Sequence, residues 1–275
     1  MSTPPPSRYR HSLRLLVPAL RVLMGKPSSI SHDSALLLRG AHPTPRALRI
    51  ENIPESLPFV LIINHYDRPG LGAWWGAATI ATTVAARCAR EIRMVMAREW
   101  WYPGGFGKLV KQPMTHWAFG QIARAYGILT LPPVIDEYRG QGGLDVRRVL
   151  AVTRGDNPAV VIIAPEGHTG SNLSLCQPPD GAGLFLLMLT HDTLPCVPAG
   201  IFEDETNTLT VNFGAPFKLA VSKKLSKTER DHAAARQAMV QIGKLLPEKM
   251  WGVYAADIAQ AIDAEKDTNK KSIDA

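Results

Sequence analysis

Cysteine is scarce in this chain of 275 residues, which holds only Cys88, Cys176 and Cys196. An odd number at wide spacing excludes a disulfide framework, and no two have the C-x-x-C spacing of a zinc or redox site. We therefore expect a reducing compartment, the cytoplasm, and no bound metal.

Long apolar runs without charge are also missing. Residues 12–25 are rich in leucine and valine, but Arg14 and Arg21 interrupt them, and a membrane span needs about 20 apolar residues. Residues 69–86 carry no charge, yet their proline, glycines and threonines favour a buried helix over a membrane span. A secretory signal needs an apolar region without arginine, so none is predicted.

Acidic residues are absent from residues 1–26, which hold Arg8, Arg10, Arg14, Arg21 and Lys26 and so supply five of the seven net positive charges. A basic amphipathic helix binds at the headgroup level of a membrane that contains anionic lipid. We predict that residues 1–40 are an interfacial segment and that the protein is cytoplasmic and peripherally attached to a membrane. Two other interpretations stay open: a first helix packed on the domain with solvated arginines, and an organellar targeting peptide.

Between the two ends, short apolar runs alternate with longer helical patterns. Strands are predicted at 59–63, 92–97, 127–131, 159–164 and 194–201, and helices at 71–90, 105–126, 144–153 and 183–190. Residues 209–213 alternate apolar and polar side chains, which is typical of a half-exposed strand at a sheet edge. A final helix begins with the capping-box pattern Ser226-Lys227-Thr228-Glu229.

These patterns predict an α/β fold in which a largely parallel central sheet is flanked by helices. We expect one such domain over residues 41–250, followed by a charged tail over residues 251–275.

Polar clusters follow the two most hydrophobic strands directly. Asn64, His65, Asp67 and Arg68 come after residues 59–63, and Glu166, Gly167, His168 and Thr169 come after residues 159–164. The carboxyl ends of parallel strands meet at one edge of a sheet, where ligands bind. A histidine there suits general-base chemistry, because its ordinary pKa of about 6.5 lets it accept a proton at neutral pH. Alternatively, His65 caps the next helix and Glu166 holds a loop by hydrogen bonds.

Four segments carry a resemblance to a known family. They are Asn64-His65-x-Asp67, Gly127-Ile128-Leu129, Ala164-Pro-Glu-Gly-His-Thr169 and Pro195-Cys-Val-Pro198. In order and spacing they resemble the four blocks of the glycerolipid acyltransferases, which include the lysophosphatidic acid acyltransferases. The likeness spans residues 52–217.

The resemblance implies an O-acyltransferase. His65 takes the proton from a hydroxyl of a lysophospholipid or related lipid acceptor, which attacks the thioester of acyl-CoA or of an acyl carrier protein. No metal or further cofactor is implied, and the partners are a membrane surface with anionic lipid, a lipid acceptor and, as the alternative donor, an acyl carrier protein. Besides the catalytic pair His65 and Asp67, the residues assigned to substrate binding are Asn64, Arg68, Gly127, Arg139, Glu166, Gly167, His168, Thr169 and Pro198.

The sequence departs from the family pattern at three places. Gly70 stands where the family has the aspartate that orients the histidine, so Asp67 is assigned that role. Arginines of the family are missing near Pro133 and at Thr169. Because a guanidinium suits a phosphate head group, either the acceptor lacks a phosphate or Arg139 or His168 substitutes.

Two other functions stay open beside the transferase. One is a lipid- or carrier-binding protein without catalysis, which the missing aspartate favours. The other is a thioester hydrolase in which His65 activates water. Nucleic-acid binding is not expected, because the basic N-terminal segment has no interleaved aromatic residues.

Overall fold

The computed structural model describes residues 8–9, 13–55, 58–88, 92–133, 136–138, 142–154, 159–191 and 193–273. Its centre is a seven-stranded sheet with the order β3-β9-β8-β4-β7-β5-β6. The strands are β3 (Arg46–Leu48), β4 (Val60–Ile63), β5 (Ile92–Ala97), β6 (Leu129–Leu131), β7 (Val160–Ile163), β8 (Cys196–Glu203) and β9 (Leu209–Phe213). The five strands from β8 to β6 are parallel, whereas β9 is antiparallel to β8. The predicted α/β class with a largely parallel sheet is confirmed.

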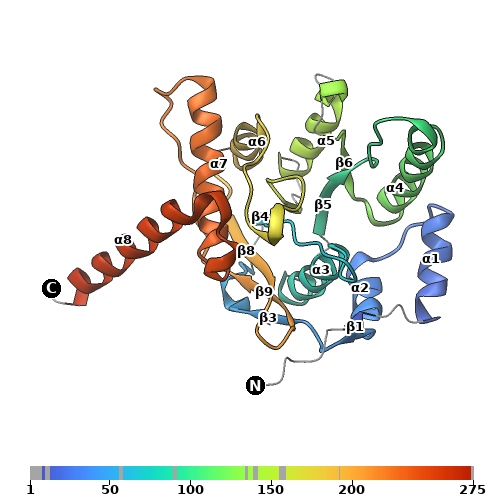
Figure 1. The fold of residues 1–275 in the computed structure, drawn as a ribbon, viewed down its shortest axis with the longest axis horizontal. Helices are drawn as coiled ribbons and strands as arrows, with labels where there is room; N and C mark the ends of the chain where they lie inside the picture. The colour runs from blue at the N-terminus through green and yellow to red at the C-terminus, as the bar shows by residue number, and fades with distance from the viewer. Residues whose placement is uncertain are drawn as a thin grey trace.

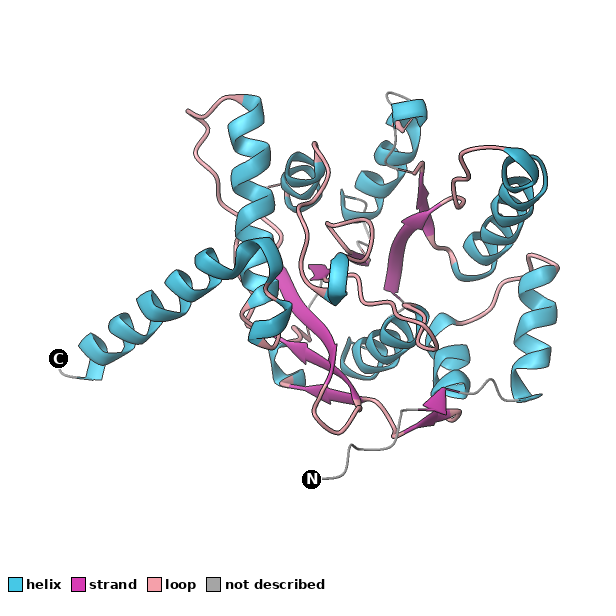
Figure 2. Cartoon of the chain, in the orientation of Figure 1, coloured by secondary structure: helices cyan, strands magenta, loops and turns pink. Residues whose placement is uncertain are grey.

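Helices cover the sheet on both sides (Figures 1 and 2). They are α1 (Leu16–Leu23), α2 (Ile30–Leu38), α3 (Trp74–Cys88), α4 (Gln112–Tyr126), α5 (Gly143–Arg154), α6 (Ala182–Thr190), α7 (Lys227–Gly243) and α8 (Ala255–Ile273). Shorter elements are the strands β1 (Arg8–Tyr9) and β2 (Ala41–His42), the π-helical turn η3 (Gly107–Lys111), and the 3₁₀ turns η1 (Leu13–Leu15), η2 (Ile50–Asn52), η4 (Asp136–Tyr138), η5 (Ser171–Leu173), η6 (Glu248–Met250) and η7 (Gly252–Tyr254).

The two central strands are apolar throughout because neither face of them meets water. β4 reads Val-Leu-Ile-Ile and β7 reads Val-Val-Ile-Ile, and they pair in parallel with Ile62 opposite Ile163. Both therefore end at the same level and deliver the residues that follow them, 64–70 and 164–169, to one edge of the sheet.

The prediction of an edge strand at residues 209–213 is wrong. β9 lies between β3 and β8, and four of its five residues are buried. Its polar side chains are satisfied inside the protein: the Thr210 hydroxyl donates to the Thr208 carbonyl, and the Asn212 amide donates to the Leu245 carbonyl. The short strand β3 pairs with β9 and takes the edge position in its place. The alternation of apolar and polar residues in β9 is therefore compatible with burial, because its polar side chains bond within the protein.

The C-terminal part is helical. The capping box is present at Ser226, whose hydroxyl accepts the Glu229 N–H while the Glu229 carboxylate accepts the Ser226 N–H. After α7, residues 255–273 of the expected charged tail form α8, which is anchored by the buried Ile258 and by the ion pair of Arg236 with Asp257. The sequence of α8 is mostly charged and polar, so it shows no strong apolar pattern from which a helix could be predicted.

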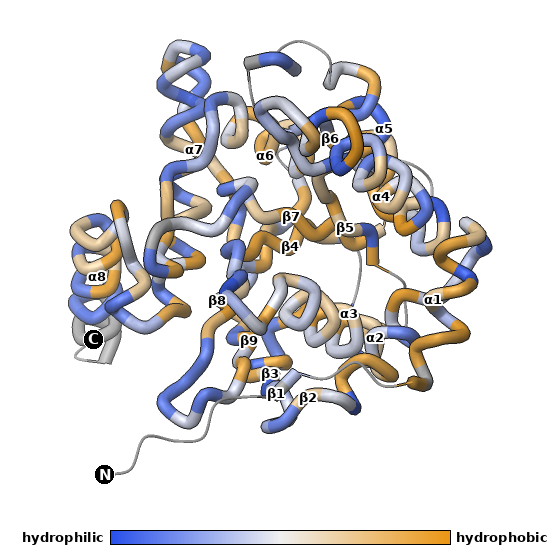
Figure 3. Tube along the Cα trace, turned by 45° about the vertical axis from the view of Figure 1, so that its right-hand side comes forward, coloured by the Kyte–Doolittle hydropathy of each residue, from blue (hydrophilic) through white to orange (hydrophobic). Residues whose placement is uncertain are grey.

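The N-terminal segment places α1 beside α4 (Figure 1). Only Pro18 of α1 is buried, and the exposed side chains include Leu16, Val17 and Leu20. Figure 3 shows this helix as one of the strongly hydrophobic stretches at the surface of the fold. Among the described residues, the helices are either too short or too polar to cross a bilayer.

Candidate functional site

His65 and Thr169 meet at the carboxyl edge of the sheet. They follow the neighbouring strands β4 and β7, and His65 Nδ1 lies 2.7 Å from Thr169 Oγ1. When Nδ1 donates its proton to this hydroxyl, Nε2 carries the lone pair of the neutral ring. None of the described residues hydrogen-bonds to Nε2, and the side chain is half-buried.

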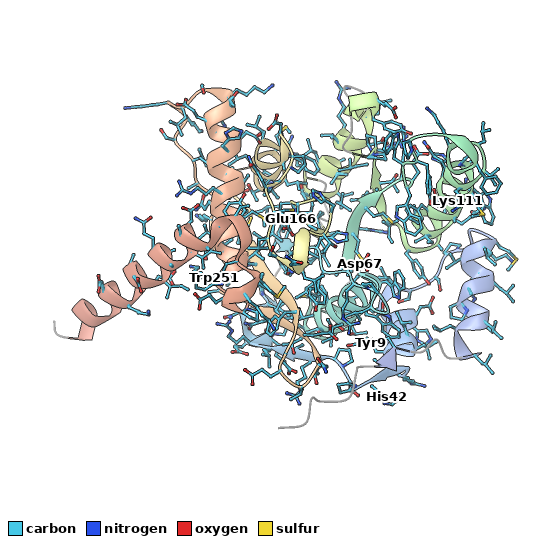
Figure 4. All side chains as sticks on the ribbon, viewed as in Figure 1. Tyr9, His42, Asp67, Lys111, Glu166 and Trp251 are labelled. Atoms are coloured by element: carbon cyan, nitrogen blue, oxygen red, sulfur yellow. The ribbon has the colours of Figure 1, made fainter. Side chains whose placement is uncertain are left out.

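Glu166 fixes the backbone around His65. Its Oε2 accepts the N–H of His65 at 2.9 Å, and its Oε1 accepts the N–H of Cys176 at 2.8 Å. The side chain is buried, and burial raises the pKa of its carboxyl group although the two N–H donors oppose that rise. The contacts thus match the loop-holding alternative for Glu166, and its carboxylate is bonded to the backbone of His65 itself. Figure 4 labels Glu166 and Asp67 in the central part of the fold.

The electrostatic surroundings of His65 favour its neutral form. Burial lowers the pKa of His65 below 6.5, the negative charge of Asp67 acts in the opposite direction, and His168 lowers it further. Asp67 itself is exposed, and the partner of the ring nitrogen is Thr169. Asp67 therefore acts on the imidazole through space, without the hydrogen bond that an orienting aspartate makes.

Asn64 continues the sheet beyond the end of β4. Its Nδ2 donates to the Ile201 carbonyl at 2.9 Å, and its Oδ1 accepts the Ile201 N–H at 2.7 Å. The amide is buried and is engaged on both sides by β8. The structure thus places this residue in the sheet, where it holds the start of the His65 loop against the adjacent strand.

Arg68 forms a two-pronged ion pair with Glu203 at the end of β8. Its Nε and one terminal nitrogen each lie 2.5 Å from a different carboxylate oxygen. The Tyr66 hydroxyl donates to the same carboxylate at 3.0 Å, and burial together with Glu203 raises the pKa of Tyr66. Glu203 and Tyr66 were missed by sequence reasoning, because nothing in the sequence links residues 137 positions apart.

Replacing Glu203 with alanine is expected to lower the free energy of unfolding by about 2 kcal/mol. The variant leaves Tyr66 and the guanidinium of Arg68 without their shared acceptor, and the partial exposure of Arg68 moderates the loss. Urea unfolding followed by circular dichroism measures the effect. Glu205→Ala, an exposed neighbour in the same connection, is the control and should stay within about 0.5 kcal/mol of the native chain.

Gly70 belongs to a tight turn. The N–H of Leu71 donates to the Arg68 carbonyl at 2.9 Å, Pro69 takes the first central position, and Gly70 takes the second with φ of 83°. This combination is typical of a type II turn, in which the second central residue needs positive φ. An aspartate at position 70 would therefore be strained in this turn.

The remaining residues of the third block lie at the same edge and are exposed. Gly167 has φ of 70°, and a Cβ on it would contact nothing within 4 Å. His168 Nε2 lies 3.6 Å from the Cys176 sulfur. Burial and the nearby Glu166 raise the pKa of the Cys176 thiol to about 12, so it is protonated at neutral pH and is a poor nucleophile.

Two predicted site residues, Gly127 and Pro198, are not brought to His65. Gly127, with φ of 61°, ends α4 at the amino end of β6, three strands away from β4. Pro198 is buried within β8 opposite Ile62, and its carbonyl accepts the Gly214 N–H at 2.8 Å. Arg139 lies outside the described residues.

A further cation at this edge is Arg98, which follows β5 directly. Its guanidinium lies 5.0 Å from the centre of the Tyr138 ring and 3.4 Å from the Glu99 carboxylate. Glu99 is buried and also accepts the Tyr138 hydroxyl at 2.7 Å. The rule that selected His65, a polar residue directly after a buried strand, would have found Arg98 as well.

Possible metal ligands gather in one place within the described part of the chain. Asp180, Asp231 and His232 have ligand atoms within 4.8 Å of one another, at the start of α6 and in α7. Both oxygens of Asp231 already accept backbone N–H groups, from Gly181 at 2.6 Å and from Leu184 at 2.8 Å. These contacts explain the buried carboxylate as a link between α6 and α7.

In comparisons with known proteins, the chain matches no protein-family model and no curated protein. Among solved structures it is similar to the crystal structure of the 1-acyl-sn-glycerophosphate (LPA) acyltransferase PlsC from Thermotoga maritima. The two chains are 14% identical, the match covers 78% of this chain and 74% of the other, and the TM-score is 0.43.

Proposed function

We propose that this protein is an O-acyltransferase that moves a fatty acyl group from a thioester to a hydroxyl of a lipid acceptor. The observation that carries the proposal is the half-buried His65 at the carboxyl edge of the sheet, with Nδ1 bonded to Thr169 and Nε2 free of described partners. The four sequence blocks that resemble glycerolipid acyltransferases support the same reaction.

His65 acts as the general base in this proposal. Nε2 takes the proton of the acceptor hydroxyl while the hydroxyl oxygen attacks the thioester carbonyl carbon. The carbon–sulfur bond then breaks, an ester remains, and the departing thiolate takes the proton from the imidazolium. Atoms and charge balance without a metal or a covalent intermediate on the protein.

Thr169 is the positioning residue for His65. In this proposal its hydroxyl accepts the Nδ1 proton, which leaves the lone pair on Nε2. The aspartate of a catalytic triad enforces the same tautomer, because a carboxylate can only accept, whereas a hydroxyl can also donate. A hydroxyl carries no charge, so it stabilises the imidazolium less than a carboxylate would. The nearby charge of Asp67 supplies part of that stabilisation, because it raises the pKa of His65.

The donor is acyl-CoA or an acyl carrier protein, and the acceptor is a lysophospholipid or a related lipid. For an acceptor with a phosphate, the edge that holds His65 offers the guanidinium of Arg98, which is paired with Glu99, and the imidazole N–H of His168 as hydrogen-bond donors. Helix α1 binds a membrane that contains anionic lipid, and the protein acts from the cytoplasmic side of it.

Product analysis tests the proposal. The native chain is incubated with acyl-CoA carrying a labelled acyl group and with total lipid extract, while thiol release is measured, and the lipids are then separated by chromatography. We expect thiol release together with label in a new ester lipid, and neither with His65→Ala.

The other outcomes decide against a transferase. Label in free fatty acid identifies a thioester hydrolase that uses the same base. If acyl-CoA and an acylated carrier protein both give no release above the His65→Ala background, the site is a binding site without catalysis.

Replacing Thr169 with valine is expected to lower kcat by about 30-fold and to leave KM within about twofold, because valine keeps the shape and removes the acceptor for Nδ1–H. Thr169→Ser restores the hydroxyl and should recover most of kcat. Steady-state kinetics on the three proteins measures both constants. An equal loss in the serine variant would show that restoring the hydroxyl is not sufficient, and the assignment of the effect to the hydrogen bond would then fail.

A further inference from the structure

Two segments of the chain contain basic residues and no acid. Residues 1–32 and residues 100–126 together hold eight lysines and arginines, and the rest of the chain holds one acid more than it holds bases. The bases of these two stretches, which lie about 70 residues apart in sequence, are therefore enough to account for the net positive charge of the chain. Acid-free basic residues also occur elsewhere, as in residues 206–228 with four lysines.

The fold brings these two segments to the same side of the molecule. The Ser28 N–H donates to the Ala125 carbonyl at 2.8 Å, and a Cβ on Gly25 would come within 2.6 Å of the Gln121 side chain. Helices α1 and α4 lie next to each other at the right of Figure 1, and Lys111 lies above α1 in Figure 4.

Residues 100–117 expose large apolar side chains on this side. We call them the aromatic platform: Trp100, Phe106, Leu109, Val110, Met114 and Trp117. Phe106 is 69% exposed and Leu109 is 78% exposed, values close to those of the apolar residues of α1 and η1. Large apolar side chains gathered in this way mark an interaction surface.

The part of the platform around Phe106 projects away from the rest of the fold. Gly104 and Gly105 precede it, the latter with φ of 58°, and no atom lies within 4 Å of a Cβ placed on either one. Phe106 and then the turn η3 follow, and η3 presents Leu109 and Val110 beside the exposed Lys108 and Lys111. Tryptophan together with lysine at an apolar surface is the combination that occupies the interface of a membrane.

We propose that the aromatic platform is a second membrane-binding element, which enters a bilayer containing anionic lipid together with α1. The occupant follows from charge, because neither segment holds an acid that would repel anionic head groups. The inference rests on the membrane binding proposed above for α1 and extends it to a distant part of the chain.

The platform also sets how the protein lies on the membrane. It follows β5, whose carboxyl end belongs to the same edge as that of β4. A bilayer that contacts residues 100–111 therefore lies beside the edge that holds His65, where a lipid acceptor would enter. With α1 alone as the anchor, the orientation of this edge would be free.

Vesicle co-sedimentation of the full chain tests the platform. The probe is phosphatidylcholine vesicles with about 30% phosphatidylglycerol. The double variant Phe106→Ser with Leu109→Ser is expected to bind about tenfold more weakly than the native chain, because two apolar side chains no longer enter the bilayer. The matched control is Leu144→Ser with Val253→Ser, which removes two side chains of similar exposure outside both segments and should change nothing.

The charge of the platform is tested separately. Lys108→Gln with Lys111→Gln should weaken binding to these vesicles about tenfold at low salt and leave the weak binding to pure phosphatidylcholine unchanged. Lys223→Gln with Lys224→Gln makes the same charge change elsewhere and should bind like the native chain. A loss in both lysine pairs would show that net charge, and not this surface, attracts the protein.

The outcomes separate this inference from the proposed function. If the native chain binds and Phe106→Ser with Leu109→Ser binds equally well, α1 alone anchors the protein and the inference fails. If sedimentation analysis shows that the native chain is a dimer and this variant a monomer, the surface binds a second copy of the chain and the inference also fails. Acyl transfer to a lysolipid below its aggregation concentration should persist in the platform variants, since it requires His65 and no membrane.

Discussion

His65→Ala is expected to lower kcat/KM for acyl transfer by about 10³-fold, because a positioned general base contributes about 10²- to 10⁴-fold. The fold should survive the change: the buried contact at this position is the His65 N–H to Glu166, which alanine retains. Kinetics on variant and native chain measures the ratio, and equal melting temperatures serve as the control. A loss of less than about fivefold would remove His65 from the mechanism.

The pH dependence of the native chain follows from the same residue. Burial holds the pKa of His65 below 6.5, so the neutral base is present at neutral pH and is lost only as pH falls below that value. We expect kcat/KM to be flat near pH 7 and to decline on the acid side of pH 6.5. Asp67→Asn removes a charge that raises this pKa, so the acid limb should move to lower pH. A limb that moves to higher pH would contradict the assignment.

Gly183→Ala is expected to lower the free energy of unfolding by about 3 kcal/mol or to prevent folding. A Cβ on Gly183 would lie 1.9 Å from the Asp231 carbonyl oxygen and 2.8 Å from the Ala235 nitrogen. These atoms belong to the backbone of α7, so α6 and α7 would have to separate, and overpacking of this kind has no side-chain solution. Urea unfolding of the soluble protein, or the yield of soluble protein, measures the effect.

Gly120→Ala is the matched control for this prediction. Gly120 lies inside α4, and no atom lies within 4 Å of a Cβ placed on it. Alanine should be neutral there or stabilise the helix by up to about 1 kcal/mol. If Gly183→Ala proves as mild as Gly120→Ala, the close approach of α6 and α7 is not a feature of the folded protein.

The sequence predicts the parts of the fold that depend on local apolar pattern. β4 and β7 lie inside their predicted runs, because strands buried on both faces must be apolar throughout. β5 also has the bounds predicted for it, although it contains Arg93 and is mostly half-buried. β9 was misplaced, because alternation also arises when buried threonine and asparagine bond to the protein itself. The sequence predicts a charged tail where the structure has α8. Few side chains of this helix contact the core, so its sequence carries little apolar pattern.

The candidate site was predictable to the level of the sheet edge. Parallel neighbouring strands bring residues 64–68 and 164–169 together, so His65 and Thr169 could be grouped from the sequence. Their hydrogen bond, and that of Glu166 with the backbone of His65, depend on side-chain directions that only the folded loops define. The same holds for Glu203, which closes the loop through Arg68 from the far end of β8.

The contacts that anchor the loop after β4 determine whether it can unfold separately from the sheet. Asn64 ties it to β8, the His65 amide is held by a buried carboxylate from the β7 side, and Arg68 closes it on Glu203. Three neighbouring strands thus share the loop, so it belongs to the cooperative unit of the core and not to the locally fraying parts of the chain. The hydrogen-bonded amide of His65 would then exchange with solvent only when the sheet itself unfolds, and substrates meet a base whose backbone position is fixed by the folded core.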